Sequence, residues 1–156
     1  MEMMDTKNQQ QGRQANSNGR DFEDLIAQIL RSKGYEKLMY IPAEPHRAFY
    51  VPQLRGMFYS IYDLPMRADF YVWHPCKFPN GLIIECKYQE TSGPADEKYP
   101  YVIASLRKTG IPAILFIIGN GAKRQAVQWA VDQQDENLTV FQNLESFLMF
   151  ANRGKI

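Results

Sequence analysis

The stretch from Arg67 to Gln89 reads RADFYVWHPCKFPNGLIIECKYQ, and it decides the fold. Its two apolar runs, Ala68–His74 and Gly81–Tyr88, are rich in aromatic and β-branched residues, a composition typical of strands. Proline, asparagine and glycine fill the connection between the runs, and these residues favour turns. The stretch therefore predicts an antiparallel hairpin of two central strands.

Charged residues interrupt this apolar hairpin. If Asp69 lies opposite Glu85, then Tyr71 lies opposite Ile83. Cross-strand partners and alternate residues of one strand share a face, so this register places Asp69, Glu85 and Lys87 on one face of the sheet. A shift by one residue would send the two acids to opposite faces.

Two carboxylates and an ammonium group in such a hairpin indicate a functional site, because burying them is costly unless they are paired or bind a metal. Adjacent carboxylates suit hard cations such as Mg²⁺, for which Mn²⁺ should substitute. Such a cation stabilises charge on a phosphoryl oxygen, and an ammonium group beside it adds to that effect. The alternative is that Glu85 and Lys87 form an ion pair on an exposed strand, which leaves the isoleucines around them unexplained.

Patterns on both sides of the hairpin extend the fold. Apolar residues between 21 and 34 fall on one helical face, and the segment 57–62 has the composition of a strand. Beyond the hairpin we expect a helix over 96–108, a strand over 111–118, a helix over 122–133, a strand over 138–141 and a helical segment over 144–150. This order predicts an α/β protein with a mixed central sheet flanked by helices.

Length and composition set limits on the rest. The chain has 156 residues and a net charge of +1, which argues against binding nucleic acid by overall charge alone. Residues 1–19 are polar and lack apolar periodicity, so we expect a disordered tail followed by a single domain over 20–156. No apolar run suits a membrane helix or a signal peptide, so we expect a cytoplasmic protein without a membrane partner.

The segments Arg67-Ala-Asp69 and Leu82-Ile-Ile-Glu85-Cys-Lys87-Tyr-Gln89 resemble motifs II and III of the PD-(D/E)XK nuclease superfamily. The predicted order of elements is similar to the αβββαβ core of that superfamily, the restriction-endonuclease-like fold. The resemblance covers roughly residues 21–141. One departure is Ala68, which stands where the motif has proline.

The resemblance implies a role for each residue of the two motifs. Asp69 and Glu85 would be ligands of a Mg²⁺ ion, and the backbone carbonyl of Cys86 would complete its protein ligands. Lys87 would be the catalytic lysine.

The resemblance also extends to positions outside the hairpin. Many members carry a glutamate on the first helix, and Glu23 is the matching position, with Asp24 as its competitor. Gln89 resembles a glutamine that some branches carry after the lysine. The segment 92–101 resembles a stretch of some small stand-alone nucleases and would place Asp96, Glu97 or Lys98 at the start of a helix beside the site, with Lys98 as a candidate contact to nucleic acid.

Basic and aromatic residues precede the hairpin and supply candidate contacts to nucleic acid. Arg47, Arg55 and Arg67 lie in or next to the strands that lead to the site, so we expect them to contact phosphates. The aromatic-rich segment 49–62 could contact either DNA or a second subunit.

Together these features predict a divalent-metal-dependent nuclease that hydrolyses DNA phosphodiester bonds, an endonuclease of the restriction, homing or resolvase type. One compact domain would act as a homodimer or larger homo-oligomer, so that two sites reach two strands. Two alternatives remain: an inactive nucleic-acid-binding or scaffold protein with the same fold, and an interaction domain with fortuitous charges. With two histidines and no glycine-rich phosphate loop, a zinc or nucleotide site has little support.

Overall fold

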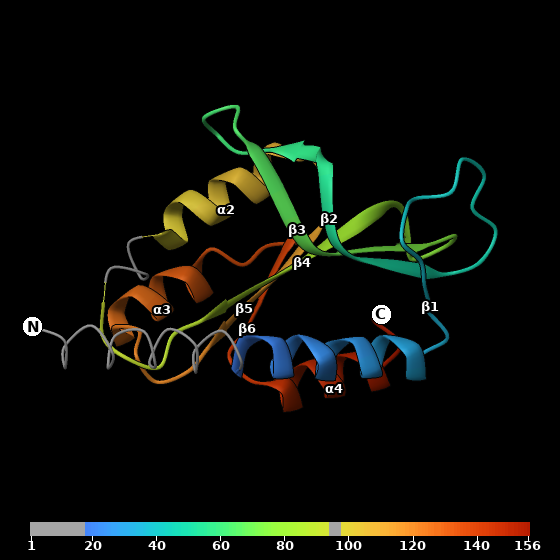
Figure 1. The fold of residues 1–156 in the computed structure, drawn as a ribbon. Coiled ribbons are helices and arrows are strands. Elements are labelled where there is room, and N and C mark those ends of the chain that lie inside the picture. The colour runs from blue at the N-terminus through green and yellow to red at the C-terminus, as the bar shows by residue number, and fades with distance from the viewer. Residues whose placement is uncertain (1–17, 94–97) are drawn as a thin grey trace, which may run out of the picture.

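The computed structural model describes residues 18–93 and 98–156, which form a six-stranded mixed sheet with helices on both faces (Figure 1). Neighbouring strands follow one another in chain order across the sheet, and only the pairs β2–β3 and β3–β4 are antiparallel. The strands are β1 (Glu36–Lys37), β2 (Phe49–Tyr59), β3 (Pro65–His74), β4 (Phe78–Tyr88), β5 (Ala113–Ile118) and β6 (Leu138–Phe141).

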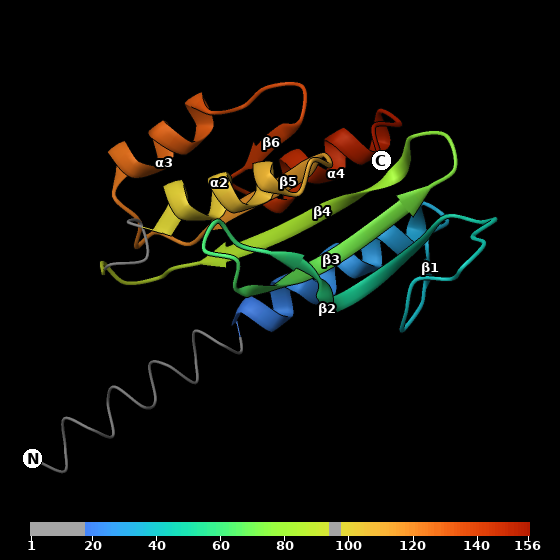
Figure 2. The same cartoon turned by 90° about the horizontal axis from the view of Figure 1, so that it is seen from above.

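Helices cover the two faces in pairs. The helices after the hairpin are α2 (Tyr99–Lys108), α3 (Arg124–Asp132) and α4 (Leu144–Asn152). α2 and α3 lie on one face, while the first helix, helical over residues 18–32, lies with α4 on the other (Figures 1 and 2). Within the described residues no helix combines the length and the apolar character needed to cross a bilayer.

Each face of the sheet has its own apolar core. Ile83 and Leu115 pack with side chains of α2, whereas their neighbours Ile84 and Phe116 pack with side chains of the first helix and α4. Successive residues of one strand thus serve opposite cores, because a sheet covered on both faces buries every residue of its central strands.

The predicted architecture is confirmed: this is an α/β protein with a mixed central sheet flanked by helices. The central hairpin also has the expected register, since Tyr71 pairs with Ile83 and Phe70 pairs with Ile84. In this register Asp69 and Glu85 lie next to the pair of Phe70 and Ile84, one acid on each strand.

The predicted strand before the hairpin is present, but its bounds were wrong. A strand over 57–62 was expected, whereas β2 begins at Phe49, passes through Pro52 and ends at Tyr59. Proline lacks an N–H group, so a strand tolerates it where one edge is unpaired. β1 pairs only with Phe49 and Tyr50, which leaves β2 as an edge strand at Pro52.

The boundary of the predicted tail also needs correction. Residues 18 and 19 were assigned to the tail, but they belong to the first helix. Gly19 lies against Tyr88, and Asn18 hydrogen-bonds the Tyr88 hydroxyl, so contacts with β4 extend the helix beyond its apolar pattern. The remainder of the predicted tail, 1–17, and the predicted helix start at Asp96 lie outside the described residues.

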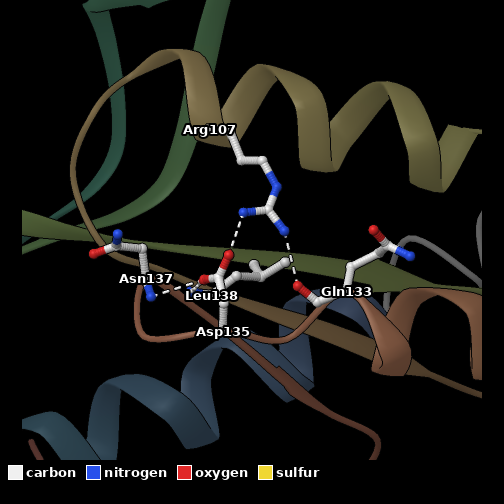
Figure 3. A network of polar contacts seen from close by, with 5 residues as sticks. All are labelled: Arg107, Gln133, Asp135, Asn137 and Leu138. Atoms are coloured by element: carbon white, nitrogen blue, oxygen red, sulfur yellow. Dashed lines mark hydrogen bonds and ion pairs between the residues drawn. The ribbon is translucent and has the colours of Figure 1, made fainter.

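A charged network ties the end of α2 to the loop before β6 (Figure 3). Arg107 donates to the Asp135 carboxylate (2.5 Å) and to the carbonyl of Gln133 (2.8 Å). The other Asp135 oxygen accepts from the backbone N–H groups of Asn137 (2.8 Å) and Leu138 (2.9 Å). The hydrogen bond from Arg107 lowers the pKa of Asp135, so the network stays ionised at neutral pH and fixes α2 in place.

The loops that follow β4 and β5 pack against each other without room for side chains. A Cβ atom at Gly119, whose φ is +98°, would lie 2.1 Å from the carbonyl oxygen of Gln89. The Gln89 side-chain amide donates to the carbonyl groups of Thr91 (3.0 Å), Gly93 (3.4 Å) and Gly121 (3.5 Å). This packing fixes the strand end that follows the lysine motif.

We therefore expect Gly119→Ala to destabilise the protein by more than the roughly 1–2 kcal/mol of a left-handed alanine, because its Cβ would also meet backbone. Gly34→Ala is the matched control, since Gly34 has φ +89° but open space around it. Urea unfolding of the two variants measures the difference. Equal loss of stability in both variants would contradict the close packing of these loops.

Candidate active site

The site begins where β3 and β4 separate. Their ladder has its last pair at Phe70 and Ile84, which are the neighbours of Asp69 in β3 and of Glu85 in β4. The backbone N–H of Cys86, which follows in β4, donates instead to the Asp69 carboxylate at 2.8 Å. An acidic side chain thus replaces a backbone carbonyl as the hydrogen-bond partner, and the buried N–H stays satisfied while the strands part.

Two further acids reach Asp69 from different elements. Glu85 of β4 and Glu23 of the first helix each share a side-chain hydrogen bond with Asp69. One carboxylate oxygen of Glu23, one of Asp69 and the Cys86 Sγ atom all lie within 4.8 Å of one another. Asp69 is 3% exposed and Glu85 is 5% exposed, so the cluster is largely removed from water.

Crowding of these acids favours their protonated forms. Burial, followed by the charge of Asp69, raises the pKa of Glu23 from 4.5 to about 7, although the charge of Arg67 opposes the shift. Burial and the hydrogen bond with Asp69 raise the pKa of Glu85 well above its ordinary value, against the attraction of Lys87. Protons therefore offset a repulsion that a divalent cation could offset equally well.

The acids open into a cavity of about 490 Å³ between the parted strands and α2. Arg67 lies at its mouth, with Nη2 3.2 Å from Asp69 Oδ1 and a side chain that is 48% exposed. Lys87 also lines the cavity and is half-buried. The full lining comprises Glu23, Arg55, Gly56, Pro65, Met66, Arg67, Asp69, Glu85, Cys86, Lys87, Tyr101, Val102 and Ser105.

Comparison with known proteins agrees with this geometry. A family model described as the PD-(D/E)XK nuclease superfamily domain matches residues 14–155. The chain belongs to the PD-(D/E)XK nuclease superfamily. No curated protein and no solved structure matches the chain significantly.

Nucleases of this superfamily use divalent metals, and the donor atoms of this cluster fit such an ion. Glu23, Asp69 and Glu85 offer carboxylate oxygens, which hard cations prefer. Burial, and after it the charge of Asp69, raises the pKa of the Cys86 thiol well above its ordinary value. Carboxylate oxygens therefore make up most of the donor set, which fits a hard divalent cation.

The structure distinguishes between the two acids proposed for the first helix of this PD-(D/E)XK domain. Glu23 lines the cavity, whereas Asp24 is exposed and does not. Gln89 is buried, but it does not line the cavity, and its side-chain amide donates to the loop carbonyl groups described above. Gln89 therefore makes no contact with the cavity that would support the catalytic role expected for it.

The four predicted nucleic-acid contacts fall into two groups. Arg55 and Arg67 line the cavity. Arg47, in the loop between β1 and β2, and Lys98, at the start of α2, are exposed and do not line it.

α2 supplies a wall of the cavity that the sequence did not reveal. Both Tyr101 and Ser105 line the cavity, and neither was expected at the site. The one available signal was a serine among the apolar residues of the predicted helix, and in the structure Ser105 is fully buried on the apolar face of α2. Its hydroxyl accepts a hydrogen bond from the backbone N–H of Ile61 (3.2 Å).

The tip of the β2–β3 hairpin projects over α2 (Figure 1) and exposes several large apolar side chains. Tyr62, 70% exposed, stacks on Tyr101 with ring centroids 5.4 Å apart. Lys108 holds the turn by binding the carbonyl of Ser60 (2.8 Å) and the carboxylate of Asp63. The exposed apolar side chains of the tip are Met57, Tyr59, Ile61, Tyr62 and Leu64.

The raised pKa of Glu23 predicts how the metal-free protein responds to pH. Between pH 4.5 and about 7 the folded state binds a proton that the unfolded state has released, so stability falls as pH rises through this range. Glu23→Gln should remove this part of the pH dependence. Thermal unfolding in EDTA across this range, compared with wild type, measures it.

The exposed Glu44, in the loop before β2, offers a matched control. Glu44→Gln should leave the pH dependence of the melting temperature as in wild type. If Glu23→Gln shows the wild-type slope as well, Glu23 is not held against Asp69.

Proposed function

We propose that this protein is a divalent-metal-dependent nuclease that hydrolyses DNA phosphodiester bonds, with its catalytic centre in the cavity between β3, β4 and α2. One observation carries the proposal: three carboxylates from three elements converge on a cavity that also holds Lys87 and two arginines. Glu23, Asp69 and Glu85 bind the cation, together with the backbone carbonyl of Cys86. The ion is Mg²⁺, for which Mn²⁺ substitutes.

The side chains of the cavity have distinct tasks in this proposal. Arg55 and Arg67 bind the phosphate, for which the planar guanidinium group offers paired hydrogen bonds. Lys87 donates to the scissile phosphate and stabilises the negative charge that develops on it. The bound cation supplies Lewis acidity, which polarises the phosphoryl oxygens and makes a nearby water more acidic.

The balance of charges favours catalysis over binding alone. Three carboxylates beside a phosphate backbone weaken nucleic-acid binding unless a cation offsets them. An inactive binding or scaffold protein gains nothing from keeping Glu23, Asp69 and Glu85 together, and their burial costs stability. A metal-dependent hydrolase needs both the acids and Lys87.

The side of the cavity that carries Arg55 and Arg67 is exposed. A DNA strand bound there would be cut at an internal bond. We expect an endonuclease that acts in the cytoplasm as a homodimer or larger homo-oligomer, so that paired sites cut both strands. Gln89, Arg47 and Lys98 remain candidates for longer-range effects, Gln89 by holding the loops after the motif and the two basic residues by contact with flanking phosphates.

Substitutions that keep the shape of the acids test the proposal. Asp69→Asn, Glu85→Gln and Lys87→Met should each lower kcat/KM by about 10²–10³-fold or more, because the first two weaken binding of the cation and the third removes the ammonium group that stabilises the transition state. Supercoiled, linear, single-stranded and branched DNA are incubated with Mg²⁺, Mn²⁺ or EDTA. We expect nicking of supercoiled DNA with either metal and none with EDTA.

The exposed Asp24 gives the control, since Asp24→Asn changes a neighbouring acid on the same helix and should cut as wild type does. Equal cleavage by wild type, Asp69→Asn and Glu85→Gln would place the site elsewhere. Binding of DNA without cleavage under every metal condition would favour the inactive scaffold.

The exposed side chains of the hairpin tip favour contact with unpaired bases of the DNA. A stable protein interface buries about 800 Å² from 20–30 residues on each side, more than one small patch supplies. A single exposed tyrosine, in contrast, is sufficient to stack a base. Because Tyr62 stacks on Tyr101 of the cavity wall, a base on Tyr62 would lie next to the catalytic centre.

Tyr62→Ala should therefore weaken binding of single-stranded or branched DNA by about 5- to 100-fold, the range for loss of one stacked base, and affect fully paired DNA little. Fluorescence anisotropy with Ca²⁺ in place of Mg²⁺ measures the affinities. Met39→Ala, at an exposed apolar residue in the connection between β1 and β2, serves as control. Loss of self-association with unchanged DNA affinity would instead identify the tip as a subunit contact.

A further inference from the structure

Gln53 has an unusual backbone for a residue inside a strand. Its φ is +55°, in the left-handed region of backbone conformations that residues other than glycine rarely adopt. Asp63 is the other described non-glycine residue with positive φ, but it lies in the turn after β2, where aspartate tolerates this conformation. Gln53 lies within β2, so nothing in local turn chemistry accounts for its strain.

The position of Gln53 connects it to the acidic cluster. β2 and β3 pair at Pro52 with Phe70 and at Leu54 with Ala68, which places Gln53 opposite Asp69. Gln53 therefore lies next to Asp69, the acid at the centre of the cluster. The strand of Asp69, β3, has β2 with Gln53 on one side and β4 on the other.

The left-handed backbone also explains which way the side chain points. Val51 packs into the core on the α2 side, whereas Tyr50 packs into the core on the side of the first helix. Strict alternation along β2 would direct Gln53 to the α2 side with Val51. Instead its amide Nε2 lies 3.3 Å from a carboxylate oxygen of Glu23 on the first helix.

We propose that Gln53 is a positioning residue: its left-handed backbone turns the side-chain amide toward the first helix, where it holds Glu23 facing Asp69 so that both carboxylates bind one cation. The proposal rests on the function proposed above. Strained residues persist where the surroundings hold them and the site requires them, and hydrogen bonds to metal-binding side chains tune metal affinity.

Two substitutions distinguish the effect of the side-chain amide from the effect of the left-handed backbone. Gln53→Ala and Gln53→Gly both remove the amide, so each should weaken Mn²⁺ binding about tenfold in calorimetry. Only glycine relieves the left-handed strain, so Gln53→Gly should melt about 2–4 °C above Gln53→Ala in EDTA. The two variants thus share a metal defect and differ in stability, a pattern that a merely structural residue would not give.

Two further variants test whether the effect passes through Glu23. In a Glu23→Ala background, adding Gln53→Gly should leave the remaining Mn²⁺ affinity unchanged, because the side chain that accepts the hydrogen bond from the amide is gone. Asp63→Gly relieves positive φ away from the cluster and should leave Mn²⁺ affinity as in wild type.

The outcomes separate this proposal from the one it rests on. Wild-type Mn²⁺ affinity in Gln53→Ala and Gln53→Gly, with wild type still binding metal and cutting DNA, would overturn the positioning role alone. Equal melting temperatures of these two variants would overturn the strain. A wild-type protein that neither binds Mn²⁺ nor cuts DNA would overturn the proposed nuclease function itself.

Discussion

The hydrogen bond from the Cys86 N–H to the Asp69 carboxylate is the contact on which this site depends. Two paired strands can part only if their buried backbone groups find other partners. Here the side chain of Asp69 takes the place of a backbone carbonyl, so β4 continues beside β5 while the space next to β3 opens. One acidic residue therefore both creates the cavity and lies inside it.

The same residue contributes to the electrostatics of the cluster. Burial is the largest cause of the raised pKa of Glu23 and of Glu85, and the hydrogen bonds and charge of Asp69 add to it. Such an arrangement reduces stability unless protons or a cation offset the repulsion. Stability given up at a site in this way is expected where function requires it. The charged network around Arg107 and Asp135, in contrast, pairs opposite charges and fixes α2 (Figure 3).

The sequence predicted the features that follow from alternation along a strand. A central hairpin with one charged face allows a single register, so Asp69 and Glu85 could be placed together, as the pairing of Tyr71 with Ile83 confirms. The sequence could not reveal what depends on tertiary contacts. The course of β2 through Pro52 depends on how short β1 is, the wall formed by α2 depends on packing across the sheet, and the left-handed backbone of Gln53 has no counterpart in residue type.

The most direct test of this account is a crystal structure of the protein with Mn²⁺, read through the anomalous signal of the metal. We expect a peak in the cavity at about 2 Å from carboxylate oxygens of Asp69, Glu85 and Glu23, in place of the hydrogen bonds that now join these acids. An empty cavity at saturating Mn²⁺, with those hydrogen bonds intact, would contradict it.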